Sequence, residues 1–266
     1  MTDAEHPPAC AHCRGREDSR FTTPITMAFQ PIVDVVDRRI WAQEALVRGT
    51  DGAGAAAILG MVDDASRYSF DQKCRTTAIE VASRTGLPDA LSFNFMPNAV
   101  YEPQACIRTT LMAAERNEFD LSRLIFELTE TEIVRDPLHL RKIVTAYRRF
   151  GFRTAIDDFG AGFAGLGLLI DMQPDIIKID RKLIAGIDAE PVRQAVLAGI
   201  AETAGRLGIS IVAEGIERLE EARWLAAHGI RLMQGYLFAR PVFEGHVAAG
   251  DINWPDLGEV ATPSAA

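Results

Sequence analysis

The chain has few cysteines for its length, four in 266 residues, and they do not form the dense framework of a disulfide-stabilised domain. No apolar run is long enough to span a membrane. The opening segment, MTDAEHPPACAHCRGRED, is polar and lacks the apolar stretch of a secretory signal peptide. These absences argue against a secreted or membrane protein, and we expect a cytoplasmic location.

Basic residues are also in deficit, with 28 Lys and Arg against 37 Asp and Glu and a formal net charge of −9. Non-specific binding to a DNA or RNA duplex requires a basic surface, so this charge balance argues against that function. An anionic substrate stays compatible where bound cations or local Lys and Arg side chains reverse the field.

The two ends of the chain differ from its middle, because residues 1–21 and 250–266 show no regular hydrophobic pattern. We predict a flexible N-terminal arm at 1–21, a single folded domain at 22–249 and a loose tail at 250–266, with no attached signalling domain. The arm contains a CxxC pair, Cys10 and Cys13, with His6 and His12 beside it. Zinc binding is possible there, but four ligands within eight residues make a tetrahedral site awkward, so we favour a flexible or redox-reactive arm.

Strand-like and helical patterns alternate between the two ends. Strands are predicted at residues 27–35, 40–48, 90–97, 124–130, 153–159, 175–180, 210–216 and 230–238, and helices at 67–85, 107–116, 138–150, 192–207 and 219–228. This alternation predicts a mostly parallel sheet, and eight strands predict an α/β fold of the (β/α)8 TIM-like barrel type. Only residues 36–39 separate the first two strands, too few for a helical crossover, so one strand near the N-terminus should be antiparallel.

Acidic and amide residues stand at the ends of these apolar runs, where a barrel enzyme has its active site. They are Glu44, Asn94, Glu127, Asp157, Asp158 and Glu214. Oxygen ligands without cysteine or histidine suit Mg²⁺ or Mn²⁺. Since adjacent strand residues point to opposite faces, Asp157 can reach inward while Asp158 turns as its strand ends. Two ions bridged by a carboxylate, a device for phosphoester hydrolysis, would relieve the repulsion between them.

Further polar residues follow the same strands. Lys178 could orient an attacking water or neutralise charge on a phosphate, and Arg48 offers a fork that fits a phosphate. Asp180, Gln234 and Gln30 also lie on these runs. The glycine-rich segment after Asp158, which includes Gly160 and Gly162, could gate the site, with Glu130 and Glu217 holding that loop or the metal ligands in place.

Seven segments in order resemble the EAL-domain cyclic di-GMP phosphodiesterases: EALVRG, FNFMP, FELTE, IDDFGAGF, IKID, VAEGIE and QGYLFARP. The resemblance covers roughly Met27–Val242. It implies hydrolysis of one phosphodiester of cyclic di-GMP to linear pGpG with two Mg²⁺ or Mn²⁺ ions. It also implies a homodimer paired through helices near the Asp157–Asp158 strand.

The resemblance assigns a role to each matching position. Glu44, Asn94, Glu127 and Asp157 would hold one metal, and Asp157 would bridge to a second that Asp158 and Glu214 approach. Lys178 would position the nucleophilic water, and Glu214 would be a ligand or the general base. Gln234 and Glu217 would support the substrate, a metal-bound water or the loop. Gln30, Leu46, Arg48 and Asp180 would contact substrate, and Thr129, Glu130, Gly160 and Gly162 would support the loop.

Two alternatives differ from this enzyme. Some EAL domains have lost catalytic residues and act as cyclic di-GMP sensors or as protein-binding regulators. Here no motif position is lost, although DDFGAGF stands where DDFGTGY is the commoner form, so catalysis is favoured over a regulator with a protein partner. A barrel glycosidase with two carboxylates is the other alternative, but Lys178, Asn94 and the aspartate pair fit metal chemistry better.

Overall fold

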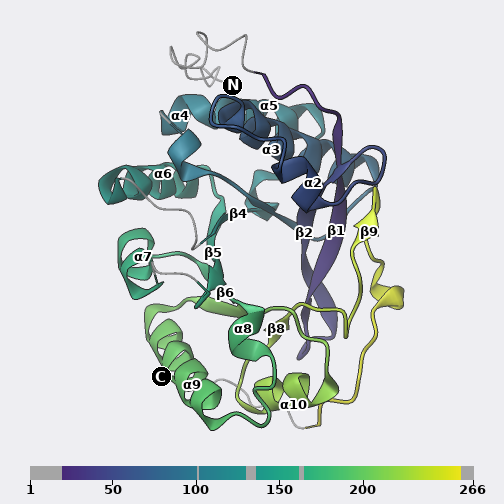
Figure 1. The fold of residues 1–266 in the computed structure, drawn as a ribbon, viewed down its shortest axis with the longest axis vertical. Helices are drawn as coiled ribbons and strands as arrows, with labels where there is room; N and C mark the ends of the chain where they lie inside the picture. The colour runs from purple at the N-terminus through teal and green to yellow at the C-terminus, as the bar shows by residue number, and fades with distance from the viewer. Residues whose placement is uncertain (1–19, 101, 130–135, 162–164, 259–266) are drawn as a thin grey trace, which may run out of the picture.

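The computed structural model of the chain describes residues 20–100, 102–129, 136–161 and 165–258 (Figure 1). Most of the predicted arm, including its histidines and its CxxC pair, lies outside the described residues, as do Glu130 and Gly162. Within the described ranges, no helix is both long and apolar enough to cross a membrane.

Eight strands close into a barrel, which confirms the predicted fold class. They are β1 (Ile25–Asp34), β2 (Arg39–Gly49), β3 (Ala90–Asn94), β4 (Leu124–Thr129), β5 (Arg153–Phe159), β6 (Ile176–Ile179), β7 (Ser210–Ala213) and β8 (Leu232–Met233). Each strand from β2 to β7 pairs in parallel with the next, and β1 closes the barrel by pairing antiparallel with both β2 and β8. The predicted antiparallel strand is therefore β1, and a short strand, β9 (Val242–Phe243), joins its outer edge.

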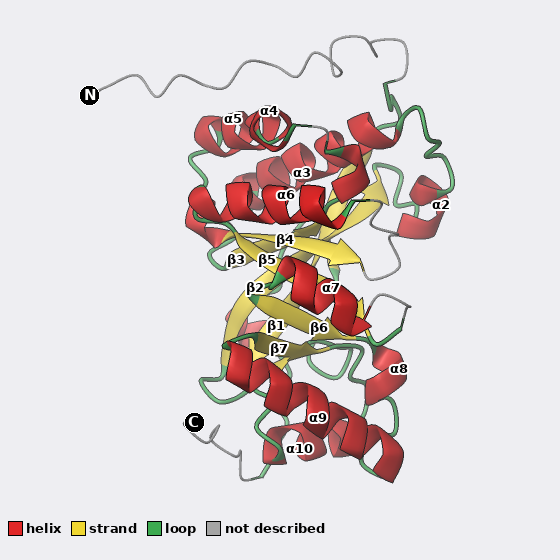
Figure 2. Ribbon diagram, turned by 90° about the vertical axis from the view of Figure 1, so that its left-hand side faces the viewer, coloured by secondary structure: helices red, strands yellow, loops and turns green. Residues whose placement is uncertain are grey.

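Helices cover the barrel on several sides, and β1 and β9 form a side without an α-helix among the described residues in Figure 1. The α-helices are α2 (Ala55–Leu59), α3 (Arg67–Arg84), α4 (Pro103–Cys106), α5 (Arg108–Arg116), α6 (Pro137–Arg149), α7 (Gly165–Met172), α8 (Arg181–Ile184), α9 (Pro191–Leu207) and α10 (Leu219–Ala227). Figure 2 shows α6, α7 and α9 on the face turned to the viewer. Short 3₁₀ turns are η2 (Pro97–Ala99), η3 (Leu121–Arg123) and η4 (Ala249–Asp251). All five predicted helices are present, as α3, α5, α6, α9 and α10.

The barrel interior begins with an apolar layer to which every strand contributes one side chain. The layer consists of Ile32, Ala42, Ala90, Ile125, Ala155, Ile176, Val212 and Leu232. Side chains along a strand alternate between faces with a period of two. The residue two positions nearer the mouth on each strand therefore points into the same interior, and this second layer positions the functional site.

The C-terminal part of the described chain packs on the barrel, which differs from the predicted loose tail at 250–266. Ile252 is buried in the main hydrophobic core, and the amide of Asn253 donates to the carbonyl of Phe238. The guanidinium of Arg38 lies 5.4 Å from the ring centroid of Trp254. A few apolar residues spaced without helix or strand periodicity therefore anchor this segment, which is why the sequence pattern did not indicate packing.

Candidate functional site

The second interior layer of the barrel is polar at all eight positions, six of them on strands and two directly after β7 and β8. Moving two residues from each member of the apolar layer gives Gln30, Glu44, Ser92, Glu127, Asp157, Lys178, Glu214 and Gln234. Seven of these were predicted as site residues from the strand ends. Polar groups at this depth cost free energy unless they are paired or coordinate an ion. The barrel thus converts eight separate sequence positions into one ring.

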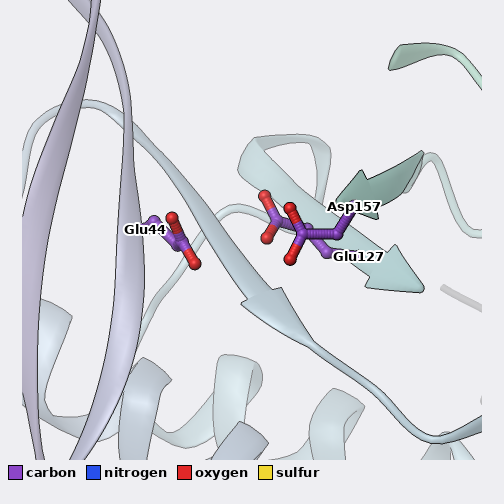
Figure 3. Close-up of side chains that lie close together, drawn as sticks. All are labelled: Glu44, Glu127 and Asp157. Atoms are coloured by element: carbon purple, nitrogen blue, oxygen red, sulfur yellow. The ribbon is translucent and has the colours of Figure 1, made fainter. Parts of the chain in front are cut away.

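Lys178 is the hub of this ring. Its ammonium nitrogen lies 2.8 Å from Asp157 Oδ1, 2.8 Å from Glu214 Oε1, 2.9 Å from Glu127 Oε2 and 3.2 Å from Glu44 Oε2. The side chains of Lys178 and Glu127 are each only 1% exposed. Figure 3 shows that Glu44, Glu127 and Asp157 come from three strands and point toward a common space. One ammonium faces four carboxylates, so the ring attracts further positive charge.

Burial changes the proton affinities of these groups. It raises the pKa of Glu127 to about 8, although Lys178 opposes the shift, and it raises the pKa of Glu214 well above its ordinary value. Burial alone would lower the pKa of Lys178, but the surrounding carboxylates, Asp157 first, hold it well above its usual range. Carboxylates that are costly to ionise beside a single ammonium are stabilised as anions by divalent cations.

The end of β5 brings two consecutive aspartates to the same site. Register shifts in the β5–β6 ladder between Ile156 and Phe159, and Asp158 has a φ of +55°, in the left-handed region. This irregularity interrupts strict alternation, and Asp158 turns where its strand ends. Burial and the charge of Asp157 together raise the pKa of Asp158 to about 6.

Two overlapping sets of carboxylates could hold metal ions. Oxygens of Glu44, Glu127 and Asp157 lie within 4.8 Å of one another, and so do oxygens of Asp157, Asp158 and Glu214. Two buried oxygens at the ring, Asp157 Oδ1 and Gln234 Oε1, have no hydrogen-bond partner among the described residues, and Asp157 Oδ1 has only its ion pair with Lys178. Hard oxygen donors in two sets that share Asp157 fit divalent cations.

Two ring members support Glu44 and Glu127. Gln234 Nε2 donates to Glu44 Oε2 at 2.8 Å, and the hydroxyl of Ser92 donates to Glu127 Oε1. The sequence analysis did not assign Ser92, which lies two residues before Asn94 on β3. These hydrogen bonds fix the carboxylate rotamers that a metal would need.

A cleft of about 550 Å³ opens beside the ring, and its lining includes Leu46, Asn94, Asp157 and Asp158. Leu46 and Asn94 were both predicted as site residues. Helix α3 contributes Asp71 to the lining, which the sequence analysis did not assign. A ligand in this cleft would lie against Asp157 and Asp158.

The other residues predicted to contact substrate form hydrogen bonds within the protein. The Gln30 side-chain amide donates to the carbonyl of Ala239 at 3.4 Å, and Arg48 donates to the carbonyl of Val47 at 2.8 Å. Asp180 caps α8 by accepting from the amide of Lys182 at 2.8 Å. Their predicted roles toward substrate stay predictions.

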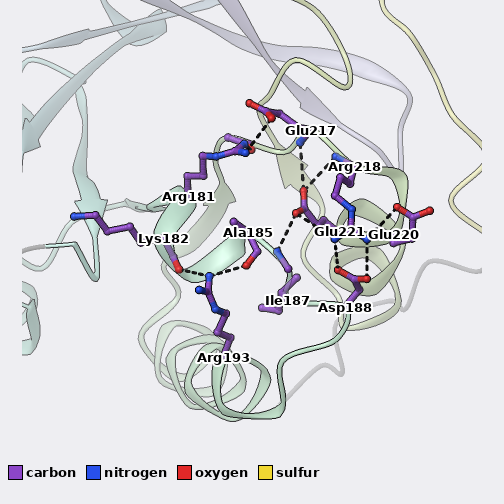
Figure 4. Close-up of polar contacts among 12 residues, drawn as sticks. Arg181, Lys182, Ala185, Ile187, Asp188, Arg193, Glu217, Arg218, Glu220 and Glu221 are labelled. Carbon is purple, nitrogen blue, oxygen red and sulfur yellow. Dashed lines mark hydrogen bonds and ion pairs between the residues drawn. The ribbon is translucent and has the colours of Figure 1, made fainter.

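The predicted loop residues are only partly described. Glu217 forms an ion pair with Arg181 at 2.9 Å, and Figure 4 shows this contact within a network that joins the loops after β6 and β7. Gly160 has a φ of +93°, and an added Cβ there would lie 2.4 Å from a methyl carbon of Leu183. Thr129 ends β4, but its side chain lies outside the described part of the chain, as do Glu130 and Gly162.

Comparison with curated proteins identifies relatives. The blue light- and temperature-regulated antirepressor BluF of Escherichia coli K12 is 34% identical over 86% of this chain and 56% of that protein. The cyclic di-GMP phosphodiesterase RocR of Pseudomonas aeruginosa is 34% identical over 62% of this chain and 42% of that protein. The chain spans about half the length of these curated relatives.

Solved structures show the same architecture. The c-di-GMP-bound standalone versatile EAL protein from Vibrio cholerae O395 is 46% identical, with a TM-score of 0.84 over 88% of this chain and 97% of that chain. The manganese and cyclic di-GMP complex of Klebsiella pneumoniae BlrP1 at pH 9.0 is 35% identical, with a TM-score of 0.79 over 84% of this chain and 57% of that chain. A family model described as the EAL domain matches residues 22–241, so this chain belongs to the EAL domain family.

Proposed function

We propose that the protein is a metal-dependent phosphodiesterase that hydrolyses cyclic di-GMP to linear pGpG. The observation that supports this most directly is the polar ring, in which two carboxylate sets share Asp157 around the ammonium of Lys178. The relative RocR is named a cyclic di-GMP phosphodiesterase, and the Vibrio and Klebsiella structures are named as complexes with the same dinucleotide.

Two divalent ions, Mg²⁺ or Mn²⁺, would be held by six side chains in this proposal. Glu44, Asn94, Glu127 and Asp157 would hold one ion, and Asp157, Asp158 and Glu214 the other. When bound, such ions act as Lewis acids toward the phosphate and the attacking water. Their charge would also keep Glu127 and Glu214 ionised despite burial.

The chain's own groups then position the reactants. In forming pGpG, water adds to phosphorus, the bond from phosphorus to the 3′ oxygen breaks, and a proton passes to that oxygen. Lys178, anchored by four carboxylates, orients the water and offsets charge that develops on the phosphate. Gln234 holds Glu44 in position, and Gln30, Leu46, Arg48 and Asp180 contact the substrate.

The first test is incubation of the purified protein with cyclic di-GMP and Mg²⁺ or Mn²⁺, with and without EDTA. Chromatography should show pGpG only when free metal is present. Glu44→Gln keeps the size of the side chain and should reduce turnover by at least about 100-fold, because it removes a metal-binding charge. The matched control is Glu80→Gln on α3, which is exposed and outside the ring. Metal-independent cleavage would overturn the proposal.

A protein-binding regulator is the second candidate, because the relative BluF is named an antirepressor and matches 86% of this chain. If cyclic di-GMP binds but stays intact in the presence of Mg²⁺ and in the presence of Mn²⁺, the result would favour a regulator that senses the dinucleotide. No binding of the dinucleotide at all would favour a domain that acts only through a protein partner.

A further inference from the structure

Beneath one wall of the cleft lies a buried ion pair that the proposed mechanism does not use. Helix α3 contains Asp71 and Arg75 one turn apart, with side chains 1% and 0% exposed and a nitrogen–oxygen distance of 2.6 Å. Arg75 also donates to the hydroxyl of Thr110 on α5 at 2.9 Å. Its guanidinium carbon lies 6.0 Å from the ring centroid of Phe126, the residue before Glu127 on β4.

Stability alone is a poor reason for this pair. Replacing a buried ion pair with apolar side chains of similar volume is often neutral or stabilising, because desolvation offsets the Coulombic attraction. The pair is also not fully satisfied, since Arg75 Nε is buried without a hydrogen-bond partner among the described residues. The reason for these two charges therefore lies in the contact that the Asp71 carboxylate makes with another part of the chain.

Asp71 holds the chain where it leaves β3 at the cleft. Its Oδ1 accepts a hydrogen bond from the backbone amide of Met96 at 2.8 Å, while Oδ2 is held by Arg75. The preceding amide, of Phe95, donates to the carbonyl of Glu127 at 2.9 Å. Asp71, Asn94 and Met96 all line the cleft beside Asp157 and Asp158.

These two ties fix the backbone on the C-terminal side of Asn94. The Phe95 amide binds β4, and the Met96 amide binds a carboxylate whose rotamer Arg75 locks from behind. Met96 is extended and precedes Pro97, so the chain turns away from the barrel immediately after the two ties. The position of Asn94 at the rim of the metal site thus depends on an acceptor on α3.

We infer that Asp71 is a positioning residue for the metal site, and that Arg75 serves to hold the Asp71 carboxylate on the Met96 amide. The pair fixes the β3 exit so that Asn94 lies at the cleft beside Asp157. This inference rests on the proposed function, because Asn94 is assigned there to a metal ion.

Two double variants separate positioning from stability. Asp71→Leu/Arg75→Met fills the space with apolar side chains and leaves no unpaired charge, but it removes the acceptor for Met96. Asp71→Asn/Arg75→Gln also removes both charges, yet the asparagine carbonyl can still accept from Met96 and its amide can pair with the glutamine. Thermal unfolding first establishes that each variant folds cooperatively.

The main readout is Mn²⁺ binding by calorimetry without dinucleotide, which needs no turnover. We expect the Leu/Met variant to bind Mn²⁺ about 10-fold more weakly, and the Asn/Gln variant to stay within about threefold of the parent. Hydrogen exchange in a peptide that covers residues 94–100 should speed up only in the Leu/Met variant, because its Met96 amide loses the acceptor.

Equal Mn²⁺ affinity in all three proteins would overturn this inference and leave the proposed function standing. An equal loss in both double variants would also overturn it, because the acceptor would then not be the determinant. If the parent protein failed to bind Mn²⁺, the proposed function would fall and the inference with it. Parent binding without hydrolysis would remove only the phosphodiesterase assignment.

Discussion

At the residue scale, Lys178 stabilises the folded protein when no metal is bound, because its ammonium compensates the charge of the carboxylates. Its ammonium contacts four carboxylates, so Lys178→Met leaves Glu44, Glu127, Asp157 and Glu214 without an ion-pair partner among the described residues. We expect the free energy of unfolding in EDTA to fall by about 3–5 kcal/mol, the usual cost of breaking a buried ion pair. Saturating Mn²⁺ should restore part of it, since ligand binding stabilises the folded state.

Urea denaturation with EDTA and with Mn²⁺ measures this effect. The control is Lys182→Met, because Lys182 is exposed on the neighbouring helix α8 and should change neither value. Turnover of Lys178→Met should fall by at least about 100-fold even with metal present. The same stabilisation by Mn²⁺ in Lys178→Met and in the parent protein would show that Lys178 and the ions do not share the carboxylates.

Most charged members of the ring could be predicted from the sequence, because each follows an apolar run at the end of a strand. Ser92 could not be singled out, since a small hydroxyl in a strand has no chemical signature of its own. Its role depends on which side chain lies opposite, and only closure of the barrel brings Glu127 to it. Asp71 and Arg75 were missed for a similar reason: the sequence of one helical turn gives no indication that its charges point inward.

At the element scale, the end of β5 depends on backbone conformations that side chains rarely adopt. Gly160→Ala puts a methyl group 2.4 Å from Leu183 at a φ of +93°. We expect a loss of about 1–3 kcal/mol in the free energy of unfolding, and lower turnover because the adjacent Asp157–Asp158 turn shifts.

The matched control is Gly199→Ala within α9, where an added Cβ meets nothing within 4 Å. That change should raise the free energy of unfolding by about 0.5–1 kcal/mol, because alanine is more stable than glycine in the interior of a helix. Chemical denaturation and turnover of the two variants side by side provide the measurement. Gly160→Ala with the stability and turnover of the parent would refute the predicted strain.

The loops after β6 and β7 are joined by one buried carboxylate, that of Glu221 on α10 (Figure 4). It accepts from the backbone amides of Gly186 at 2.9 Å, Arg218 at 3.2 Å and Glu217 at 3.4 Å. Glu221→Ala leaves these amides unpaired, so we expect a loss of about 1–3 kcal/mol in stability. Hydrogen exchange should increase at residues 183–188 and 215–218, and turnover should fall because Glu214 begins the second of these loops.

Glu220→Ala is the control for this loop contact. Glu220 is the adjacent residue, with an exposed side chain whose ion pair with Arg218 spans 3.4 Å. Surface ion pairs contribute little, so its stability and exchange should match the parent. Unchanged exchange in Glu221→Ala at both loops would show that backbone contacts alone hold them.

Long periodic elements were predicted well and short ones poorly. Helices α3, α6 and α9 have 18, 13 and 17 residues and were predicted, whereas α8 has only four residues and α2 five. The bulge at Asp157–Asp158 arises from pairing between β5 and β6, so the alternation rule alone cannot give it. Prediction from the sequence thus failed for elements of only a few residues and for features that depend on pairing between distant strands.

At the scale of the whole molecule, the barrel arranges its interior by layers. One apolar layer closes the lower interior, and the polar ring lies two residues nearer the mouth on every strand. The low-dielectric layer beneath strengthens each electrostatic contact in the ring. In an acidic protein with a net charge of −9, an anionic ligand requires bound cations or local Lys and Arg side chains that reverse the field at its site.

An exposed apolar face on α6 and α7 is where we expect a homodimer to form. Helices α6 and α7 precede and follow β5 in the chain and contact each other (Figure 2). They expose Leu138, Leu166 and Ile170 at 68%, 63% and 67%. Large exposed apolar side chains on adjoining helices are typical of an interface. We expect the protein to form dimers through this face at micromolar concentration, and Leu166→Glu/Ile170→Glu to make it monomeric.

Light scattering coupled to size-exclusion chromatography gives the mass of each species. The control, Val192→Glu/Val196→Glu, introduces the same charges one turn apart on α9, where both valines are exposed, and should stay dimeric. Helix α7 begins at Gly165, a few residues after the Asp157–Asp158 turn, so the monomeric variant should also turn over more slowly. A monomeric parent protein would assign the α6–α7 face to a different partner. Dissociation by the α9 substitutions alone would assign the dimer to a different face.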